Sequence, residues 1–403
     1  MEYQTIIVGA GFAGLYYINK FDIKNYLILE REDRIGGRVF NIEWNDSLIS
    51  LGGGVIKSTN TYTLDLCKKF GLDLIKFESE YHHVDLDGSL PNGHTLFESN
   101  KKIIEKMRDI YKKNKQEINK LKLTFDEFML KYFDYKTYRI IKHRLLYKTY
   151  LNADVSYTLD DETIYELLRI GKFETMYIKQ NGYNDLLKKL KQDISDSNIK
   201  LNTNVINIIR NGSKYTILCD NGLEYKCEKL VLATEKNPKI FIQIPNVNQI
   251  YRMVEGCQYI RVYAYWSLGH GIKNSIKSQN IPGKVIVINP NILMACYTEY
   301  YSASRLLELF GKNTKQDNII LLTNLLNNSY INVSKPDDFI YKFWDIGTHY
   351  FLPGTEFKDL RSHIKKLAQE ENVHLIGELF AKSHGWVDSA IQSVDLLYND
   401  LMI

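Results

Sequence analysis

The pattern of hydrophobic and polar positions in the first thirty residues predicts a strand, a helix and a second strand. Residues 3–8 end in a continuous apolar run, which is typical of a buried strand. Leu15, Tyr16 and Ile18 then follow a helical spacing, and residues 26–29 form a second short apolar run. Strands that alternate with helices indicate an α/β domain built on a parallel sheet.

The link between the first strand and the helix, residues 9–14, has the glycine spacing GxGxxG. Gly9 allows the tight turn, Gly11 lets the backbone approach a pyrophosphate, and Gly14 lets the helix pack closely on the strand. The free N–H groups and positive dipole end of the helix suit that pyrophosphate. Glu30 follows the second strand where an acid reaches a ribose hydroxyl, which favours a ribose without a 2′-phosphate. The turn predicts a dinucleotide site but does not distinguish NAD from FAD.

Directly after Glu30, the chain carries an arginine-bounded Gly-Gly pair that ends in Gly37-Arg38. Guanidinium groups bind phosphate in a bidentate manner, and glycines permit close approach of the backbone. Solvated loop charges are the alternative interpretation for Arg31 and its neighbours. At this point the sequence resembles the flavin-containing amine oxidase family, whose N-terminal signature is an acidic residue followed by such a pair. Residues 51–56, with their three glycines, are similar to the family's next segment.

Two later stretches resemble the family's middle and last flavin-binding segments. Residues 199–209 and 215–218 have strand patterns, and the buried-type strand 230–234 follows a turn. Residues 373–378 form a strand that ends in Gly-Glu, before a second helix start. The resemblance implies these cofactor-binding residues: Gly9, Gly11, Gly14, Glu30, Arg31, Gly37, Arg38, Gly53, Gly54, Val55, Val205, Ala233, Thr234, Gly377, Glu378, Trp386, Val387 and Ala390.

The resemblance also implies a reaction, in which a hydride passes from the α-carbon of an amine to flavin N5. Trp386 falls where the family places one wall of an aromatic cage, since aromatic faces orient amines. His349 or Tyr350 falls at the other wall, depending on register, and a histidine there would titrate near neutral pH. Most members carry a lysine that holds a water near N5, and Arg261 stands nearest that position if one inserted residue is allowed. Pairing of Arg261 with a surface acid is the alternative interpretation. Arginine is not deprotonated in proteins, which puts ordinary reoxidation by O2 in question.

These four residues, Arg261, Trp386, His349 and Tyr350, are the candidate catalytic residues, and no metal ligands are predicted. The implied cofactor is noncovalent FAD, because residues 343–354 contain no cysteine, where members with covalent flavin use one.

The expected fold is an FAD-binding Rossmann-like α/β domain of the glutathione-reductase type, with an inserted α+β substrate domain. The expected FAD-binding segments are residues 1–76, 179–243 and 369–403. The expected substrate segments are residues 77–178, which are mostly helical in pattern, and residues 244–368.

Composition excludes several other classes of protein. Of the 403 residues, 44% are hydrophobic and 25% charged, which are values of globular proteins rather than disordered ones. The net charge of +4 does not favour nucleic acid as a partner, although the lysine-rich helix pattern at residues 101–122 leaves a partner open. The five cysteines are widely spaced, which fits a reducing compartment better than a disulfide framework. Without a signal peptide or membrane span, we expect a soluble cytoplasmic protein.

Three functions remain open. The first is an FAD-dependent oxidoreductase that oxidises a primary or secondary amine, with a small-molecule amine as substrate and O2 as candidate electron acceptor. The second is a flavoenzyme that acts on a non-amine substrate, as a desaturase does. The third is a binding or structural protein that holds FAD and has lost activity. The sequence indicates neither the particular amine nor the oligomeric state.

Overall fold

The computed structural model describes residues 1–77, 81–84, 93–145, 147–160, 163–164, 168, 174–237, 239–278 and 280–402. The chain divides into two compact units. The first unit comprises Met1–Phe77, Phe173–Gly256 and Thr348–Ile403, and the second comprises Glu78–Lys172 and Cys257–Gly347.

The expected boundaries place four stretches of this first unit in the substrate domain. Residue 77 and residues 174–178 belong to the first unit because Leu74–Phe77 and Thr175–Ile178 pair as strands of one sheet. The two longer stretches, residues 244–256 and 348–368, lie in the first unit as well. The physical reason is the packing of two helices, α9 (Pro245–Tyr251) and α12 (Phe357–Glu371). The side-chain amide of Asn246 on α9 donates a hydrogen bond to the carboxylate of Glu371 at the end of α12. That helix leads directly into a strand of the first unit's sheet, so neither segment separates from this unit.

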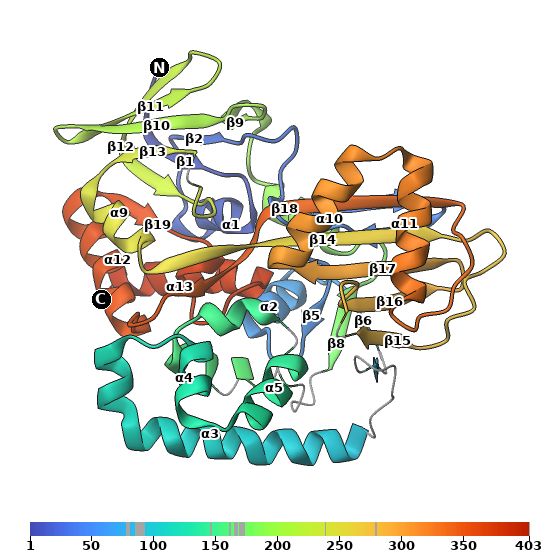
Figure 1. Cartoon of the computed structure of the whole chain (residues 1–403). Helices are drawn as coiled ribbons and strands as arrows, with labels where there is room; N and C mark the ends of the chain where they lie inside the picture. Colours follow the sequence, from blue (N-terminus) through green and yellow to red (C-terminus); the bar gives the residue numbers. More distant parts are fainter. Residues whose placement is uncertain are drawn as a thin grey trace. The chain divides into compact units, whose positions relative to one another are not determined.

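The main sheet of the first unit has eight strands, and its centre is parallel (Figure 1). β1 (Glu2–Val8) pairs in parallel with β2 (Tyr26–Leu29) on one side and with β12 (Glu224–Leu232) on the other. The remaining strands are β9 (Ile199–Lys200), β10 (Val205–Asn211), β11 (Lys214–Cys219), β13 (Phe241–Gln243) and β19 (Val373–Leu375), in the order β13-β10-β11-β12-β1-β2-β9, with β19 also on β12. Ile6 and Ile28 in the central strands are fully buried, as continuous apolar runs require in a sheet covered on both faces.

Helix α1 (Phe12–Phe21) and the C-terminal helix α13 (Val387–Met402) pack side by side in this unit. The hydroxyl of Tyr16 donates to the carboxylate of Asp395 at 3.0 Å, and the Lys20 ammonium lies 2.5 Å from the same group. These two helices are therefore packed together although they are separated by most of the chain. Two more helices of the unit are α2 (Thr61–Lys69) and α8 (Tyr183–Lys191).

Two small sheets complete the first unit. β3 (Asn41–Trp44) and β4 (Ser47–Ser50) form a hairpin, and β5 (Ile56–Lys57), β8 (Thr175–Ile178) and β6 (Leu74–Phe77) form a three-stranded sheet in that order. This second sheet holds the segment that follows the three glycines at residues 52–54.

The second unit is built on a six-stranded sheet with helices on one face (Figure 1). Its order is β18 (Asp338–Phe351), β14 (Val254–Tyr265), β17 (Ile292–Glu299), β16 (Lys284–Asn289), β15 (Ser275–Ser278) and β7 (Tyr81–Val84). Leu306 and Phe310 of α10 (Tyr300–Lys312) and Leu322 of α11 (Lys315–Asn327) share one core with Val262 and Leu293 of the strands. A mixed helix-and-sheet unit was expected here.

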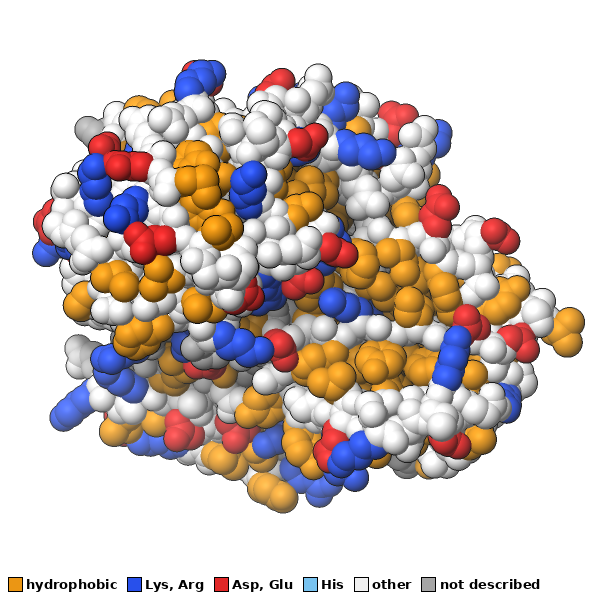
Figure 2. All heavy atoms as spheres, turned by 90° about the horizontal axis from the view of Figure 1, so that it is seen from above, with side chains coloured by type: hydrophobic (Ala, Val, Ile, Leu, Met, Phe, Trp, Pro, Cys, Tyr) orange, Lys and Arg blue, Asp and Glu red, His pale blue; other side chains and the backbone are white. Residues whose placement is uncertain are grey.

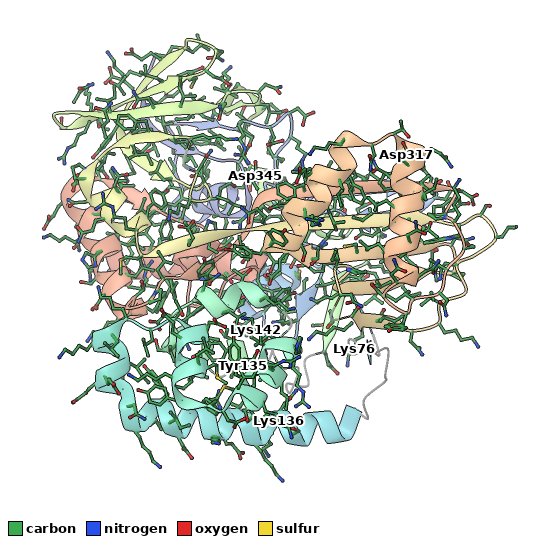
Figure 3. All side chains as sticks on the ribbon, viewed as in Figure 1. Lys76, Tyr135, Lys136, Lys142, Asp317 and Asp345 are labelled. Atoms are coloured by element: carbon green, nitrogen blue, oxygen red, sulfur yellow. The ribbon has the colours of Figure 1, made fainter. Side chains whose placement is uncertain are left out.

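The helical part of the second unit contains the lysine-rich segment. It comprises α3 (Gly93–Leu121), α4 (Phe125–Tyr132), α5 (Tyr135–Arg144) and α6 (Val155–Thr158). Ile104 and Met107 of α3 are buried, whereas most of its lysines are exposed, so the basic run forms the solvated face of an amphipathic helix. On α5, Lys142, which is labelled in Figure 3, pairs with Asp126 of α4 at 3.3 Å.

Positive and negative side chains are interspersed on the face of the molecule that Figure 2 shows, in keeping with the small net charge. In the part of the chain that the structure describes, no helix combines the length and the apolar character needed to cross a membrane.

Candidate active site

The GxGxxG turn leaves no room for side chains at its first and third glycines. Gly9 has φ +107°, and a Cβ atom built on it would lie 2.7 Å from the carbonyl oxygen of Ala233. A Cβ on Gly14 would lie 2.2 Å from the carbonyl oxygen of Gly9. The loop after β12 and the start of α1 thus both lie in close contact with this turn, so that only glycine fits at positions 9 and 14.

The second glycine of the turn faces the Gly-Gly pair that follows β2. A Cβ atom on Gly37, where φ is +56°, would lie 3.3 Å from the Cα of Gly11. The Gly36 N–H donates to the Ala10 carbonyl at 2.9 Å, which joins the two turns. No side chain of the described residues caps the N-terminus of α1, and its first turn contains no acid. The two bare turns and the uncapped helix start fit the pyrophosphate of a dinucleotide.

Glu30 holds the same turns together from the end of β2. One carboxylate oxygen accepts the Ala10 N–H at 2.7 Å, and the other accepts the Glu32 N–H at 3.0 Å. Burial raises the pKa of Glu30, and these hydrogen bonds oppose that effect. Arg31 lies 2.9 Å from the carboxylate of Glu235. Its predicted contact with the cofactor stays a prediction.

A buried network links the Gly-Gly segment to the last strand of the sheet. Arg38 donates to Glu378 Oε1 at 2.8 Å, and His349 Nδ1 lies 3.1 Å from the same oxygen. The Lys236 N–H donates to His349 Nε2 at 3.1 Å, so both nitrogens of this fully buried ring are engaged. Burial acts to raise the pKa of Glu378, but His349 and Arg38 outweigh it and hold that pKa well below its usual range.

Trp386 lies immediately before α13, next to a lysine that was not among the predicted site residues. The Nζ atom of Lys57 stands 4.0 Å from the centroid of the Trp386 ring, and Lys57 is only 5% exposed. A Cβ on Gly53 would lie 3.7 Å from Val387 Cγ2, so the predicted Gly53 and Val387 are also close. One sequence feature could have indicated Lys57. It follows directly after residues 52–56, three glycines and two apolar residues, where a strand residue is expected to be buried.

The other predicted cofactor-binding residues all lie in the first unit. Val205 is buried at the start of β10, and the Ala233 N–H donates to the Val8 carbonyl at 2.9 Å. Gly377 has φ +129°, and its N–H donates to Ser393 Oγ. The rest are Gly54 beside Ser50, the exposed Val55, Thr234 in the loop after β12, and Ala390 in the first turn of α13.

Two predicted catalytic residues remain. Tyr350 is buried at the end of β18 in the first unit. Arg261 belongs to the second unit, where it pairs in register with Tyr297 across β14 and β17. Its guanidinium carbon lies 4.6 Å from the centroid of the Tyr297 ring, a cation–π distance. No observation tests the catalytic role of either residue.

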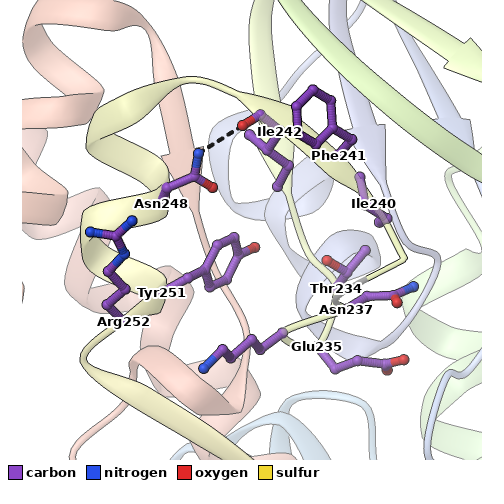
Figure 4. A pocket seen from close by; sticks show the side chains of 10 residues that line it. Thr234, Glu235, Asn237, Ile240, Phe241, Ile242, Asn248, Tyr251 and Arg252 are labelled. Atoms are coloured by element: carbon purple, nitrogen blue, oxygen red, sulfur yellow. Dashed lines mark hydrogen bonds between the residues drawn. The ribbon is translucent and has the colours of Figure 1, made fainter.

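The loop after β12 also lines a cavity of about 330 Å³ within the first unit (Figure 4). Its lining residues are Thr234, Glu235, Lys236, Asn237, Ile240, Phe241, Ile242, Asn248, Tyr251 and Arg252. Asn248 donates to the Ile242 carbonyl at 2.8 Å, and burial raises the pKa of Tyr251 to about 12. Sequence patterns alone did not indicate this cavity.

Known proteins are similar to this chain in sequence and in fold. The family described as "Flavin containing amine oxidoreductase" matches residues 18–237, more than half of the chain. A "Probable flavin-containing monoamine oxidase A" of Dictyostelium discoideum is 23% identical over 261 residues, which are 57% of each protein. An "Amine oxidase [flavin-containing] A" of Sus scrofa is 33% identical over 77 residues, 18% of this chain and 14% of that protein.

Solved structures of putrescine oxidase share the fold. The wild type bound to putrescine has a TM-score of 0.70 at 14% identity and covers 100% of both chains. A triple mutant has a TM-score of 0.72 at 14% identity, with 100% of this chain and 99% of that chain covered. The predicted mixed α/β fold is thereby confirmed. From the family match and the glycine turns together, we conclude that the chain belongs to the flavin-containing amine oxidoreductase family.

Proposed function

We propose that this chain is an FAD-dependent oxidoreductase that oxidises a primary or secondary amine at the carbon next to nitrogen. The observation that carries the proposal is the pair of facing glycine turns, Gly11 and Gly37, at the uncapped start of α1. The proposal includes noncovalent FAD, since residues 343–354 contain no cysteine.

The residues of this chain would hold the cofactor at several points. The backbone at Gly11 and Gly37 would receive the pyrophosphate, and Glu30 the ribose. The backbone of Val205 would lie against the adenine. The N–H of Val387 would meet the flavin ring, where the N-terminus of α13 favours negative charge. FAD bound in this way would supply the acceptor for the hydride that leaves the amine.

Other side chains would orient the substrate and the site. Trp386 is half-buried and offers an aromatic face for orienting an amine. Tyr350 is the better candidate for a second aromatic wall, because both ring nitrogens of His349 are already bonded to Glu378 and to Lys236. His349 is then a positioning residue, which holds the carboxylate of Glu378 in place.

The test is an absorbance spectrum of the purified protein, followed by anaerobic addition of a panel of amines. We expect flavin bands that lose their absorbance with at least one amine. A protein that binds FAD but is never reduced by an amine would contradict the proposal. Reduction by a non-amine alone would then support the desaturase-like alternative.

Arg261 motivates the remaining alternative, a protein that holds FAD but has lost oxidase activity. We expect the amine-reduced protein to react slowly with O2, and an Arg261→Lys variant to react faster. If only the Arg261→Lys variant turns over, the lost-activity alternative is supported. Turnover by the wild type excludes that alternative. Lys342→Arg, on β18 of the same unit, is a control for the lysine–arginine exchange.

A further inference from the structure

The Trp386 ring, which is expected to orient a substrate amine, is already in contact with a positively charged side chain of the protein, Lys57. Lys57 Nζ stands 4.0 Å from the centroid of the Trp386 ring, well within the range of a cation–π interaction. Lys57 is 5% exposed, so this ammonium is shielded from bulk water and its field is screened less than that of a surface lysine.

Hydrogen bonds hold the two backbone segments that bear this contact. The Lys57 N–H donates to Oδ1 of the buried Asn60 at 2.8 Å, just before helix α2. Asp388, in the first turn of α13, accepts the Thr63 N–H of α2 at 2.7 Å. The strand that bears Lys57 and the helix start that follows Trp386 are therefore tied to the same helix, and the contact is built into the fold.

We propose that Lys57 is a specificity-determining residue, which takes the cation position on Trp386 and disfavours substrates that carry a second positive charge. Like charges a few Å apart at partly buried sites repel each other strongly enough to change affinity by about tenfold or more. The preferred substrates are amines whose remote end is neutral or anionic. This inference rests on the proposed function, because it concerns the same Trp386 site. The structural neighbour putrescine oxidase, by contrast, was solved with a diamine.

Three four-carbon probes separate charge from size, namely 1,4-diaminobutane, 1-aminobutane and 4-aminobutanoate. Their binding to the oxidised, FAD-loaded protein is measured by the change in flavin absorbance, without turnover. In the wild type we expect 1,4-diaminobutane to bind at least about tenfold more weakly than 4-aminobutanoate. In Lys57→Met, which keeps the length of the side chain without its charge, this preference disappears. Lys57→Arg keeps it.

Lys76→Met is the matched control. Lys76 lies on β6 of the same three-stranded sheet, but its side chain is 64% exposed and pairs with Glu174 at 2.8 Å (Figure 3). We expect this variant to keep the wild-type preference. FAD content and circular dichroism establish that each variant is folded. A Lys57→Met protein that keeps the wild-type preference overturns the inference.

A second readout needs no substrate. Iodide and caesium quench indole fluorescence, and a Trp386→Phe variant of each protein isolates the Trp386 contribution. Because a positive charge attracts iodide and repels caesium, we expect iodide to quench Trp386 better than caesium does in the wild type. In Lys57→Met we expect the quenching constant of caesium to rise at least about twofold. Unchanged quenching in Lys57→Met overturns the inference. This readout decides the question even if none of the three probes binds. If no amine reduces the flavin but quenching changes as expected, the proposed function is contradicted, whereas the position of the Lys57 charge at Trp386 is supported.

Discussion

His349 and Glu378 form a buried pair, with Nδ1 of the imidazole 3.1 Å from Oε1 of the carboxylate. The backbone N–H of His349 donates to the same oxygen at 3.2 Å. One residue at the end of β18 thus holds the carboxylate that follows β19, and it also receives the N–H of Lys236 from the loop after β12. The pair connects three separate segments of the first unit.

Replacing His349 by alanine removes all of the imidazole's contacts. Because the Lys236 N–H loses its buried partner and a cavity forms, we expect the free energy of unfolding to fall by about 2–4 kcal/mol. Urea denaturation measures this change, and FAD affinity should fall with it. His363→Ala, on the exposed side of α12, is the control and should cost less than about 0.5 kcal/mol. Equal stability of the two variants would contradict the role of the pair.

The buried histidines predict a dependence of stability on acid pH. Burial lowers the pKa of His374 to about 3 and that of His384 to about 4, from an ordinary value of 6.5. The unfolded chain therefore binds protons below about pH 6.5 while the folded protein does not, so stability is present above that pH and is lost as the pH falls. We expect up to about 1.4 kcal/mol per pH unit from each histidine.

Urea unfolding at about pH 7, 6 and 5 measures this slope. A His374→Asn variant should show a shallower slope, because one titrating group is gone. His363→Asn should leave the slope unchanged. A steep slope that persists in His374→Asn would show that other groups cause it.

The facing glycines predict that a single methyl group disrupts cofactor binding. In Gly37→Ala the new Cβ would lie 3.3 Å from the Gly11 Cα, in the space assigned to the pyrophosphate. We expect the dissociation constant of FAD to rise at least about tenfold. Gly71→Ala is a matched control, since Gly71 has φ +64° and nothing within 4 Å of its Cβ position. Both variants should lose about 1 kcal/mol of stability, but only Gly37→Ala should lose FAD.

Glu299 in the second unit predicts a pH effect of opposite sign. Burial raises the pKa of this carboxyl above its ordinary value of 4.5, although the Thr149 N–H donates to it at 2.9 Å. Because the folded pKa lies above the unfolded one, the contribution to stability is present below about pH 4.5 and is lost as the pH rises through the folded pKa. Glu299→Gln should therefore gain stability over the wild type as the pH rises, in urea unfolding. Glu308→Gln, an exposed change on α10, should show no such gain.

Local sequence was sufficient to predict the strand and helix on either side of the glycine turn. The apolar run before Gly9 and the helical spacing after Gly14 predict β1 and α1, because their periodicity reflects burial directly. The glycine requirement at Gly9 and Gly14 is likewise local, since it follows from a tight turn against a packed helix. The expected domain boundaries stay a prediction, since residues 244–256 carry no pattern that indicates which sheet they cover.

Local patterns were thus enough to predict the glycine turn, the strands and helices next to it, and the family that the chain resembles. Which side chains meet, by contrast, follows from the packing of the folded chain. Arg38 and Glu378 are 340 positions apart, and Lys57 reaches Trp386 across most of the chain. Such contacts depend on how sheets and helices pack, because packing is governed by burial of many residues together and not by the spacing of a few along the chain.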